Sequence, residues 1–392
     1  MKSQSTLQAA REAALAKTRT QFARIEAVSF ENTSRVLEAF RNNRVSDAHF
    51  AGTNGYGYND LGRDTLDKIY AEVFGAEAAL VRVQFVNGTH AIACALFACL
   101  SPGDMMVSLT GKPYDTLETV INGGHGSLKS YGIGYSDKPA DIKTAKAVYI
   151  QRSRGYTERK ALSVADIDVL IKDARSVNPN VIAIVDNCYG EFTETREPCS
   201  VGADLIAGSL IKNPGGGLAP CGGYIAGRAE LVERAAEHLT VPGLGAEVGA
   251  SLAVNRALYQ GLYMAPHATG EALKTAVYAA ALFAELGYAV SPAYDEHRSD
   301  IIQTIELGSP ERVLAFCKGL QSGLPVDSFV TPLPWDMPGY AQPVIMAAGG
   351  FVQGGSLELS ADAPMRPPYR VYVQGGVTFD AGRYGIDCAV NS

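Results

Sequence analysis

The sequence predicts an α/β protein with two unequal domains: a large domain built on a mostly parallel sheet, followed by a smaller α+β domain. Between residues 79 and 211, short apolar runs alternate with helical patterns, which is typical of parallel strands joined by helices on both faces of a sheet. From about residue 261, an Ala-rich helical run leads into proline-rich loops and short strands. A chain of 392 residues is long enough for both domains.

The predicted elements follow the chain in order. Residues 1–50 form a helical arm, because Leu, Ala and charged residues interleave there with few Gly or Pro. The large domain, residues 51–260, opens on a Gly-rich loop and contains apolar runs predicted as strands at 79–85, 105–110, 146–151, 180–187 and 204–211. Helical patterns fill the gaps, for example at 90–100 and 165–177. The small domain, residues 261–392, contains two VQGG segments, 352–355 and 373–376, predicted as strands that end in similar turns.

Composition excludes several classes of function. The 34 Lys+Arg against 41 Asp+Glu give a net charge of −7, which disfavours nucleic acid as a partner. The seven Cys are odd in number and form no CxxC pair, which indicates reduced thiols in a cytoplasmic protein. The longest apolar run, residues 91–100, is about half the length of a membrane-spanning helix, so we expect no membrane association.

Common cofactor and catalytic motifs do not fit. Gly55, Gly57 and Gly62 are not spaced as a dinucleotide-binding fingerprint and follow no strand. The sequence has no GxxxxGK[ST], GxSxG or HExxH motif, and its six His and seven Cys show no metal-ligand spacing. We therefore expect neither a bound metal nor a nicotinamide cofactor.

Two polar residues end neighbouring apolar runs of the predicted sheet. Asp186 closes the run 180–187, and Lys212 follows the run 204–211 just before a Gly-rich turn. Ligands bind at the carboxyl edge of such sheets. Because Lys212 has no acidic neighbour in sequence, we expect a partly desolvated amine with a lowered pKa. Each residue alone could be an ordinary cap or surface residue, but together they favour a functional site.

This pair matches the needs of pyridoxal phosphate. A lysine can hold the cofactor aldehyde as a Schiff base, and a carboxylate can keep the pyridine nitrogen protonated. The phosphate needs backbone amides at a helix N-terminus, which the segment 87–90 supplies where it opens an apolar helix. Ser209, close before Lys212, can add a hydroxyl.

Longer segments of the chain carry a further signal. They are GYGYNDLGRDTL (55–66), NGTHAIACALF (87–97), GKPYDTL (111–117), IQRSRGY (150–156), VDNCYGEF (185–192), AGSLIKNPGGG (207–217), QGLYMAPH (260–267), WDMPGY (335–340) and ELSADAPMRPPY (358–369). In these segments the sequence resembles a known family, the methionine γ-lyase or aluminium resistance branch of the fold-type I pyridoxal-phosphate enzymes. They span nearly the whole chain. The resemblance implies the fold-type I transferase fold and pyridoxal phosphate as cofactor.

The resemblance implies roles for particular residues. Lys212 would be the Schiff-base lysine and proton shuttle, and Asp186 would pair with the pyridine nitrogen. Tyr114 would stack on the ring and take part in catalysis. The residues that would bind the phosphate are Gly88, Thr89, Ser209 and, from a neighbouring subunit, Tyr58 and Arg63. Since sites of this kind are shared, the resemblance implies a homo-oligomer, a dimer of dimers, with Tyr58 in the catalytic set.

Two departures concern the substrate. The related γ-lyases grip the substrate carboxylate with an Arg in the motif RLSVG, whereas this chain has Glu358 in the matching ELSAD. Arg366 is the candidate replacement. The family segment ExPxNP is replaced by QRSRGY, so its Asn is absent, and Arg152 or Arg154 could hold the ring hydroxyl or the carboxylate.

The implied function is β- or γ-elimination, a carbon–sulfur bond cleavage, on a sulfur-containing amino acid such as methionine or cystathionine. The departures leave room for another reaction with the same cofactor: γ-replacement, transamination or cyclisation in a biosynthetic pathway. The aluminium label raises a third alternative, a non-catalytic metal-tolerance protein. This last alternative is the weakest, because no carboxylate cluster suited to a trivalent ion is visible in the sequence.

Overall fold

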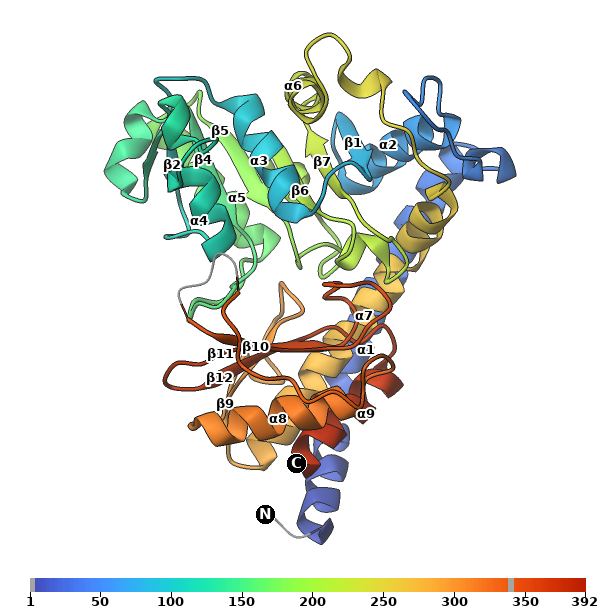
Figure 1. The fold of residues 1–392 in the computed structure, drawn as a ribbon, viewed down its shortest axis with the longest axis vertical. Helices are drawn as coiled ribbons and strands as arrows, with labels where there is room; N and C mark the ends of the chain where they lie inside the picture. The colour runs from blue at the N-terminus through green and yellow to red at the C-terminus, as the bar shows by residue number, and fades with distance from the viewer. Residues whose placement is uncertain (1–3, 338–341) are drawn as a thin grey trace.

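The computed structural model describes residues 4–337 and 342–392 and shows two domains stacked along the long axis of the molecule (Figure 1). The large domain holds a seven-stranded sheet, and the small domain holds a five-stranded one. The segment WDMPGY lies partly outside the described residues. In the described part of the chain, no helix is both long enough and apolar enough to cross a bilayer.

The helices are α1 (Gln4–Asn42), α2 (Leu61–Phe74), α3 (Gly88–Cys99), α4 (Asp115–Asn122), α5 (Val164–Val177), α6 (Ala229–Leu239), α7 (Asn255–Glu285), α8 (Pro310–Ser322) and α9 (Phe379–Asn391). The strands of the large sheet are β1 (Ala78–Arg82), β2 (Met105–Ser108), β3 (Gly134–Ser136), β4 (Ala147–Gln151), β5 (Ile182–Asp186), β6 (Leu205–Ser209) and β7 (Gly223–Gly227). Those of the small sheet are β8 (Ala289–Ser291), β9 (Gln303–Glu306), β10 (Val344–Ala348), β11 (Ser360–Pro364) and β12 (Arg370–Gln374).

Local capping explains where several helices begin. The side chains of Asp60, Asn87, Ser163 and Ser309 precede α2, α3, α5 and α8, and each accepts a hydrogen bond from a backbone N–H in the first turn. Such bonds satisfy N–H groups that have no partner inside the helix. The start of α3 is therefore fixed directly after β1, where the sequence placed the phosphate-binding turn.

The large sheet has the strand order β1-β7-β6-β5-β4-β2-β3. From β6 to β3 all neighbours are parallel, and β7 pairs antiparallel with both β1 and β6. The predicted mostly parallel sheet is confirmed, and each of the five predicted runs forms a strand in it. Two strands were not predicted: β3, which is only three residues long, and β7, which begins and ends with glycine and so resembles a turn in the sequence.

Helices cover both faces of the large sheet, as the alternating pattern predicts. On one face, α3, α4 and α6 contribute buried side chains such as Ile92, Leu117 and Leu231. On the other face, α2, α5 and α7 contribute residues such as Leu66, Ile167 and Leu262. β5 and β6 lie in the middle and are buried along their whole length.

The small sheet is entirely antiparallel, in the order β10-β11-β12-β9-β8, and it packs on α8 and α9. Of the two VQGG segments, residues 373–376 end β12 as predicted, but residues 352–355 form a turn rather than a strand. The reason is local: the buried Glu358 carboxylate accepts a hydrogen bond from Val352 N at 2.9 Å and so holds this segment in a loop.

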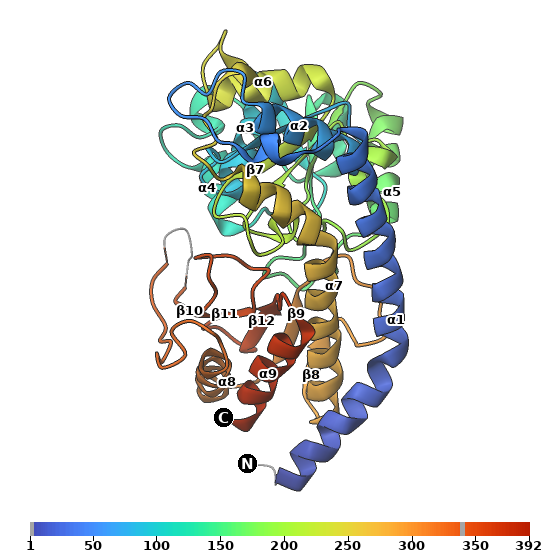
Figure 2. The same ribbon diagram turned by 90° about the vertical axis from the view of Figure 1, so that its right-hand side faces the viewer.

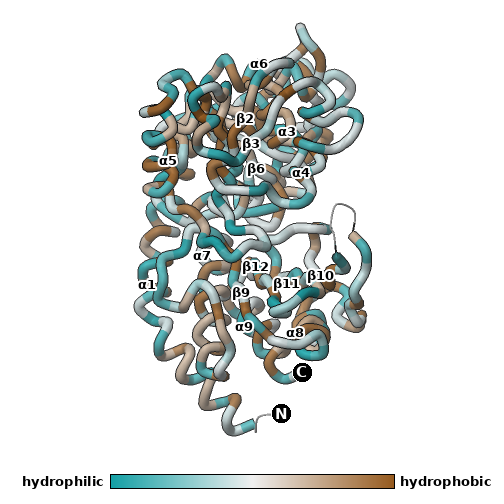
Figure 3. The backbone as a smooth tube through the Cα atoms, turned by 90° about the vertical axis from the view of Figure 1, so that its left-hand side faces the viewer, coloured by the Kyte–Doolittle hydropathy of each residue, from teal (hydrophilic) through white to brown (hydrophobic). Residues whose placement is uncertain are grey.

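The predicted helical arm is α1, which runs beside α7 past both domains (Figure 2). Hydrophilic and hydrophobic residues alternate along this helix (Figure 3). Ala14 packs into the core of the small domain, and Val36 packs into the core of the large domain. The predicted boundary between residues 260 and 261 falls inside α7. The Ala-rich run marks only the second part of that helix, which begins at Asn255 and continues from one domain into the other.

Candidate functional site

The ends of β5 and β6 bring the sequence-predicted residues together. Asp186 is the last residue of β5 and pairs in register with Ala207 of β6. Ser209 ends β6, and Lys212 lies shortly after it, directly before the short 3-10 helix η5 (Asn213–Gly215). Gly88 begins α3 so close to β6 that an added Cβ would lie 3.1 Å from the Ser209 Cβ. The prediction that Asp186, Lys212, Ser209 and Gly88 lie at one sheet edge therefore agrees with the geometry.

Asp186 is buried and held by two hydrogen bonds. The Tyr149 hydroxyl donates to Oδ2 at 3.2 Å, and Cys188 N donates to Oδ1 at 3.1 Å. Burial raises the pKa of this carboxyl, an effect that the positive charge of Lys212 partly offsets. Tyr149 was missed from the sequence. Its one signal was a hydroxyl within the otherwise apolar run of β4.

Lys212 is half-buried, and its Nζ lies 3.6 Å from the centroid of the Tyr189 ring. Burial alone would lower the pKa of this amine, but Tyr189, Cys188 and Asp186 outweigh burial and raise it. The expectation of a lowered pKa was therefore wrong. The sequence around Lys212 contains no acid, but the fold places Asp186 from the next strand beside it.

Tyr114 and Thr89 meet on the other side of the site. The two hydroxyls are 3.1 Å apart, and Tyr114 N donates to Gln151 Oε1 at 3.2 Å. Burial, followed by the nearby Asp186 and Cys188, raises the pKa of Tyr114 well above its usual value. Tyr114 is therefore a neutral phenol at pH 7.

The segment next to Gly88 has the features of an anion site. The first turn of α3 presents its free backbone N–H groups there. The Ser209 hydroxyl is buried, and among the described residues it has no hydrogen-bond partner. A buried hydroxyl without a partner is uncommon in proteins. It is the kind of group that a bound anion would satisfy.

Tyr58 and Arg63 lie on the loop and helix that precede β1. Tyr58 is 54% exposed and stacks on Tyr56, with ring centroids 5.3 Å apart. Arg63 is buried, and its Nη1 donates to the carbonyl oxygens of Gly57 at 2.7 Å and Gly249 at 3.1 Å. Within one subunit Arg63 thus braces its own loop. The contact of both residues with a neighbouring subunit's site stays a prediction.

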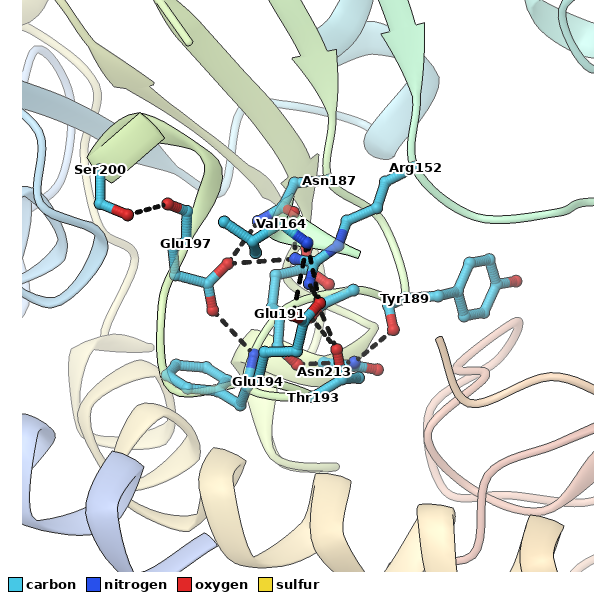
Figure 4. A network of polar contacts seen from close by, with 12 residues as sticks. Arg152, Val164, Asn187, Tyr189, Glu191, Thr193, Glu194, Glu197, Ser200 and Asn213 are labelled. Atoms are coloured by element: carbon cyan, nitrogen blue, oxygen red, sulfur yellow. Dashed lines mark hydrogen bonds and ion pairs between the residues drawn. The ribbon is translucent and has the colours of Figure 1, made fainter. Parts of the chain in front are cut away.

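Arg152 does not offer its guanidinium to a substrate in this arrangement. Its side chain is completely buried, and every nitrogen donates to a protein group (Figure 4). The acceptors are Leu162 O at 3.3 Å, Asn187 Oδ1 at 2.8 Å, Glu197 Oε2 at 3.3 Å, Thr193 Oγ1 at 3.4 Å and Glu194 Oε1 at 2.8 Å. Arg152 is thus the centre of a buried ion-pair network. Its expected role in substrate binding stays a prediction, and that role would require these bonds to be exchanged.

Arg154 is also committed to protein groups. Its Nη1 donates to Ser291 O and Oγ, both at 3.0 Å, and its Nη2 donates to Thr157 O at 3.3 Å. Because Ser291 belongs to β8, Arg154 joins the large domain to the small one. Its role toward a substrate stays a prediction, and such a role would require these bonds to be exchanged.

Arg366 is the most available of the candidate arginines. It is exposed, and its Nη2 donates a long hydrogen bond of 3.4 Å to Tyr156 O. Within the described ranges, no carboxylate lies within ion-pair distance of it. Glu358, which occupies the place of the family arginine, accepts bonds from Phe351 N at 2.6 Å and Val352 N at 2.9 Å. Glu358 therefore shapes a loop.

Behind Lys212 lies a second buried acid, Glu191, which sequence reasoning missed. The Tyr224 hydroxyl donates to its Oε1 at 2.9 Å, while its Oε2 has no donor among the residues described. Burial raises the pKa of Glu191 to about 8. The sequence signal was weak, because Glu191 lies in a polar turn, GEF, that looks exposed.

We expect Glu191 to make stability depend on pH. Its pKa rises from 4.5 in the unfolded chain to about 8 in the folded one, so between these values the unfolded state loses a proton that the folded state keeps. Stability from this group is full below pH 4.5 and is lost as the pH rises through about 8. Thermal unfolding of Glu191→Gln should therefore show a flatter dependence on pH in this window than wild type. If the melting temperatures of Glu191→Gln and wild type changed with pH in the same way, the raised pKa of Glu191 would be contradicted.

A buried carboxylate and a lysine at neighbouring strand ends, beside a helix N-terminus, define the class of fold-type I pyridoxal-phosphate enzymes. The pyridoxal-phosphate-dependent protein YhfS of Escherichia coli shares the fold, with a TM-score of 0.62 and 17% identity over 92% of this chain and 95% of that one. The chain belongs to the methionine gamma-lyase family, whose model matches residues 7–392.

Two relatives resemble the chain over nearly its whole length. The protein YnbB of Bacillus subtilis is 49% identical over 94% of this chain and 92% of the relative. A crystal structure of a "carbon-sulfur lyase involved in aluminum resistance" from Clostridium novyi NT is 47% identical, with a TM-score of 0.93 over 98% of this chain and 95% of that chain.

The residues present fit pyridoxal phosphate. The Ser209 hydroxyl, which has no partner among the described residues, and the N–H groups at the start of α3 suit its phosphate. Gly88 has no side chain that would fill the space beside Ser209. Asp186 offers a buried carboxylate for the ring nitrogen, and Lys212 offers the amine. The family and the fold neighbours imply this cofactor, and no described feature of the site conflicts with it.

Proposed function

We propose that this chain is a pyridoxal-phosphate-dependent carbon–sulfur lyase that eliminates a thiol from a sulfur-containing amino acid, such as methionine or cystathionine. The observation that carries the proposal is the pairing of Lys212 with the buried Asp186 in a chain of the methionine gamma-lyase family. The similarity to a protein described as a carbon–sulfur lyase supports the same reaction type.

Each residue has a definite task in this proposal. When bound, the cofactor supplies a ring that stabilises negative charge at the α-carbon of the substrate. Asp186 holds a proton at the ring nitrogen, and Gly88, Thr89 and Ser209 bind the phosphate. Lys212 Nζ anchors the cofactor, then takes the proton from the α-carbon and returns it later.

Tyr114 stacks on the ring in this proposal and donates a proton to the departing sulfur. A neutral phenol is required for this donation, and burial keeps Tyr114 neutral. Arg366 binds the substrate carboxylate, because its guanidinium is free of carboxylate partners in the described part of the chain. Tyr58 and Arg63 complete a neighbouring subunit's phosphate site in a homo-oligomer.

The test is product analysis with purified protein and pyridoxal phosphate. With methionine or cystathionine as the sole substrate, we expect thiol, 2-oxo acid and ammonia in equal amounts. Elimination needs no second substrate, so ammonia must form without one. Turnover that needs an added nucleophile, or transfer of the amino group without ammonia, would favour replacement or transamination instead.

A further inference from the structure

The small sheet turns a polar face toward the large domain. Along β11, Ala361 and Ala363 point into the small-domain core, so the alternating residue Asp362 points the opposite way. Along β12, Val371 and Val373 fill the same core, and Tyr372 and Gln374 therefore lie on the face of Asp362. The sheet lies between α8 and the large domain (Figure 1), so this face looks toward the strand ends that carry Asp186 and Lys212.

Contacts confirm that this face meets the loop that leaves β4. The Tyr372 hydroxyl donates to Tyr156 O at 3.1 Å, and the two rings lie 4.9 Å apart. Tyr156 follows Gln151, the last residue of β4, which pairs in register with Asp186. The same loop therefore connects the neighbourhood of Asp186 with that of Asp362.

Asp362 is buried and incompletely satisfied. Gln374 Nε2 donates to its Oδ2 at 3.1 Å, but Oδ1 has no donor in hydrogen-bonding geometry in the described part of the chain. Burial raises the pKa of Asp362, although a side-chain hydrogen bond from Tyr156, the charge of Lys212 and the hydrogen bond from Gln374 lower it in part. A desolvated carboxylate needs donors for both oxygens. In the proposed lyase, Lys212 is occupied with the cofactor, so a cation on the substrate can take its place beside Asp362.

We propose that Asp362 selects the substrate by accepting a hydrogen bond from an ammonium group at the distal end of its side chain. The inference rests on the proposed function and deepens it. A thioether that ends in an apolar methyl leaves Oδ1 unpaired, whereas one that ends in an amino acid supplies the missing donor. Because the Tyr156 side chain borders Asp362, the proposal requires its ring to move aside for the substrate to reach the carboxylate.

The test compares substrates that differ only in the distal ammonium. The substrates are L-cystathionine and two analogues, each of which lacks one of its two amino groups. The analogue that keeps the amine at the reacting end is the reactive analogue. For Asp362→Asn we expect kcat/KM for cystathionine to fall at least about tenfold, and kcat/KM for the reactive analogue to change less than about twofold. Asp173→Asn, the same change at an exposed position of α5, should alter neither value.

The outcomes are distinct. An equal loss for both substrates would overturn the proposal, because it would place Asp362 at the reacting amino group that they share. No loss for either would overturn it as well. Cystathionine and its analogues are also titrated at equilibrium into Lys212→Ala protein loaded with pyridoxal phosphate, with and without Asp362→Asn. This titration measures the binding preference for the distal ammonium without turnover. This titration separates a failure of the Asp362 assignment from a failure of the lyase function. Unchanged melting of Asp362→Asn shows that the variant folds.

Discussion

Replacing Lys212 with alanine is expected to lower kcat/KM for carbon–sulfur cleavage by at least about 10³-fold, because one amine provides both the cofactor anchor and the proton carrier. The geometry explains why no other residue takes over. Lys212 Nζ lies over the Tyr189 ring at 3.6 Å, and its charge acts on the buried Asp186. Without that charge, burial raises the pKa of Asp186 further, so the carboxylate also becomes a poorer partner for the ring nitrogen.

A second measurement separates anchoring from catalysis. Borohydride treatment of wild-type protein loaded with pyridoxal phosphate should attach the cofactor covalently to the peptide that contains Lys212, as seen by mass spectrometry. Lys212→Ala should show no attachment, and Lys143→Ala, a change at an exposed lysine, should behave as wild type. Attachment at another lysine, or activity that survives in Lys212→Ala, would refute the assigned role.

The fold could be predicted from the sequence because its central strands are buried along their whole length. β5 and β6 are continuous apolar runs, and their ends are marked by Asp186 and Lys212. The domain boundary was harder to predict, because one helix packs against both domains. α7 packs against both domains, so the shift to an Ala-rich composition indicated a boundary inside a continuous helix.

At the site, sequence reasoning succeeded for residues whose place follows from strand order and failed for those placed by tertiary contacts. The pKa of Lys212 is raised by Tyr189 and Cys188, and less by Asp186, which lie at the end of the neighbouring strand and in the turn after it, far from Lys212 in sequence. Asp362 faces the large domain only because β11 alternates between alanines of the core and polar residues. In the sequence, the motif ELSAD differs from the family motif at the place of an arginine, and nothing in it indicates that Asp362 is buried.

Arg152→Leu is expected to lower the free energy of unfolding by about 3–5 kcal/mol, because removal of one partner leaves buried charge without compensation. Glu197 is almost fully buried, and Arg152 Nη1 lies 3.3 Å from its Oε2. Asn187, next to Asp186, also receives a bond from Arg152, at 2.8 Å. The network therefore supports the turn that follows β5, including Tyr189 beneath Lys212. Urea unfolding followed by tryptophan fluorescence and circular dichroism measures the loss.

Matched variants decide between this structural role and a substrate role for Arg152. Arg24→Leu, at an exposed position of α1, should leave the unfolding free energy within about 0.5 kcal/mol of wild type. Adding Glu197→Gln to Arg152→Leu should recover part of the lost stability, because it removes one of the charges left unpaired. If Arg152→Leu instead keeps wild-type stability and raises KM for the amino acid, the guanidinium binds the substrate. The network of Figure 4 would then be exchanged for contacts with the substrate carboxylate.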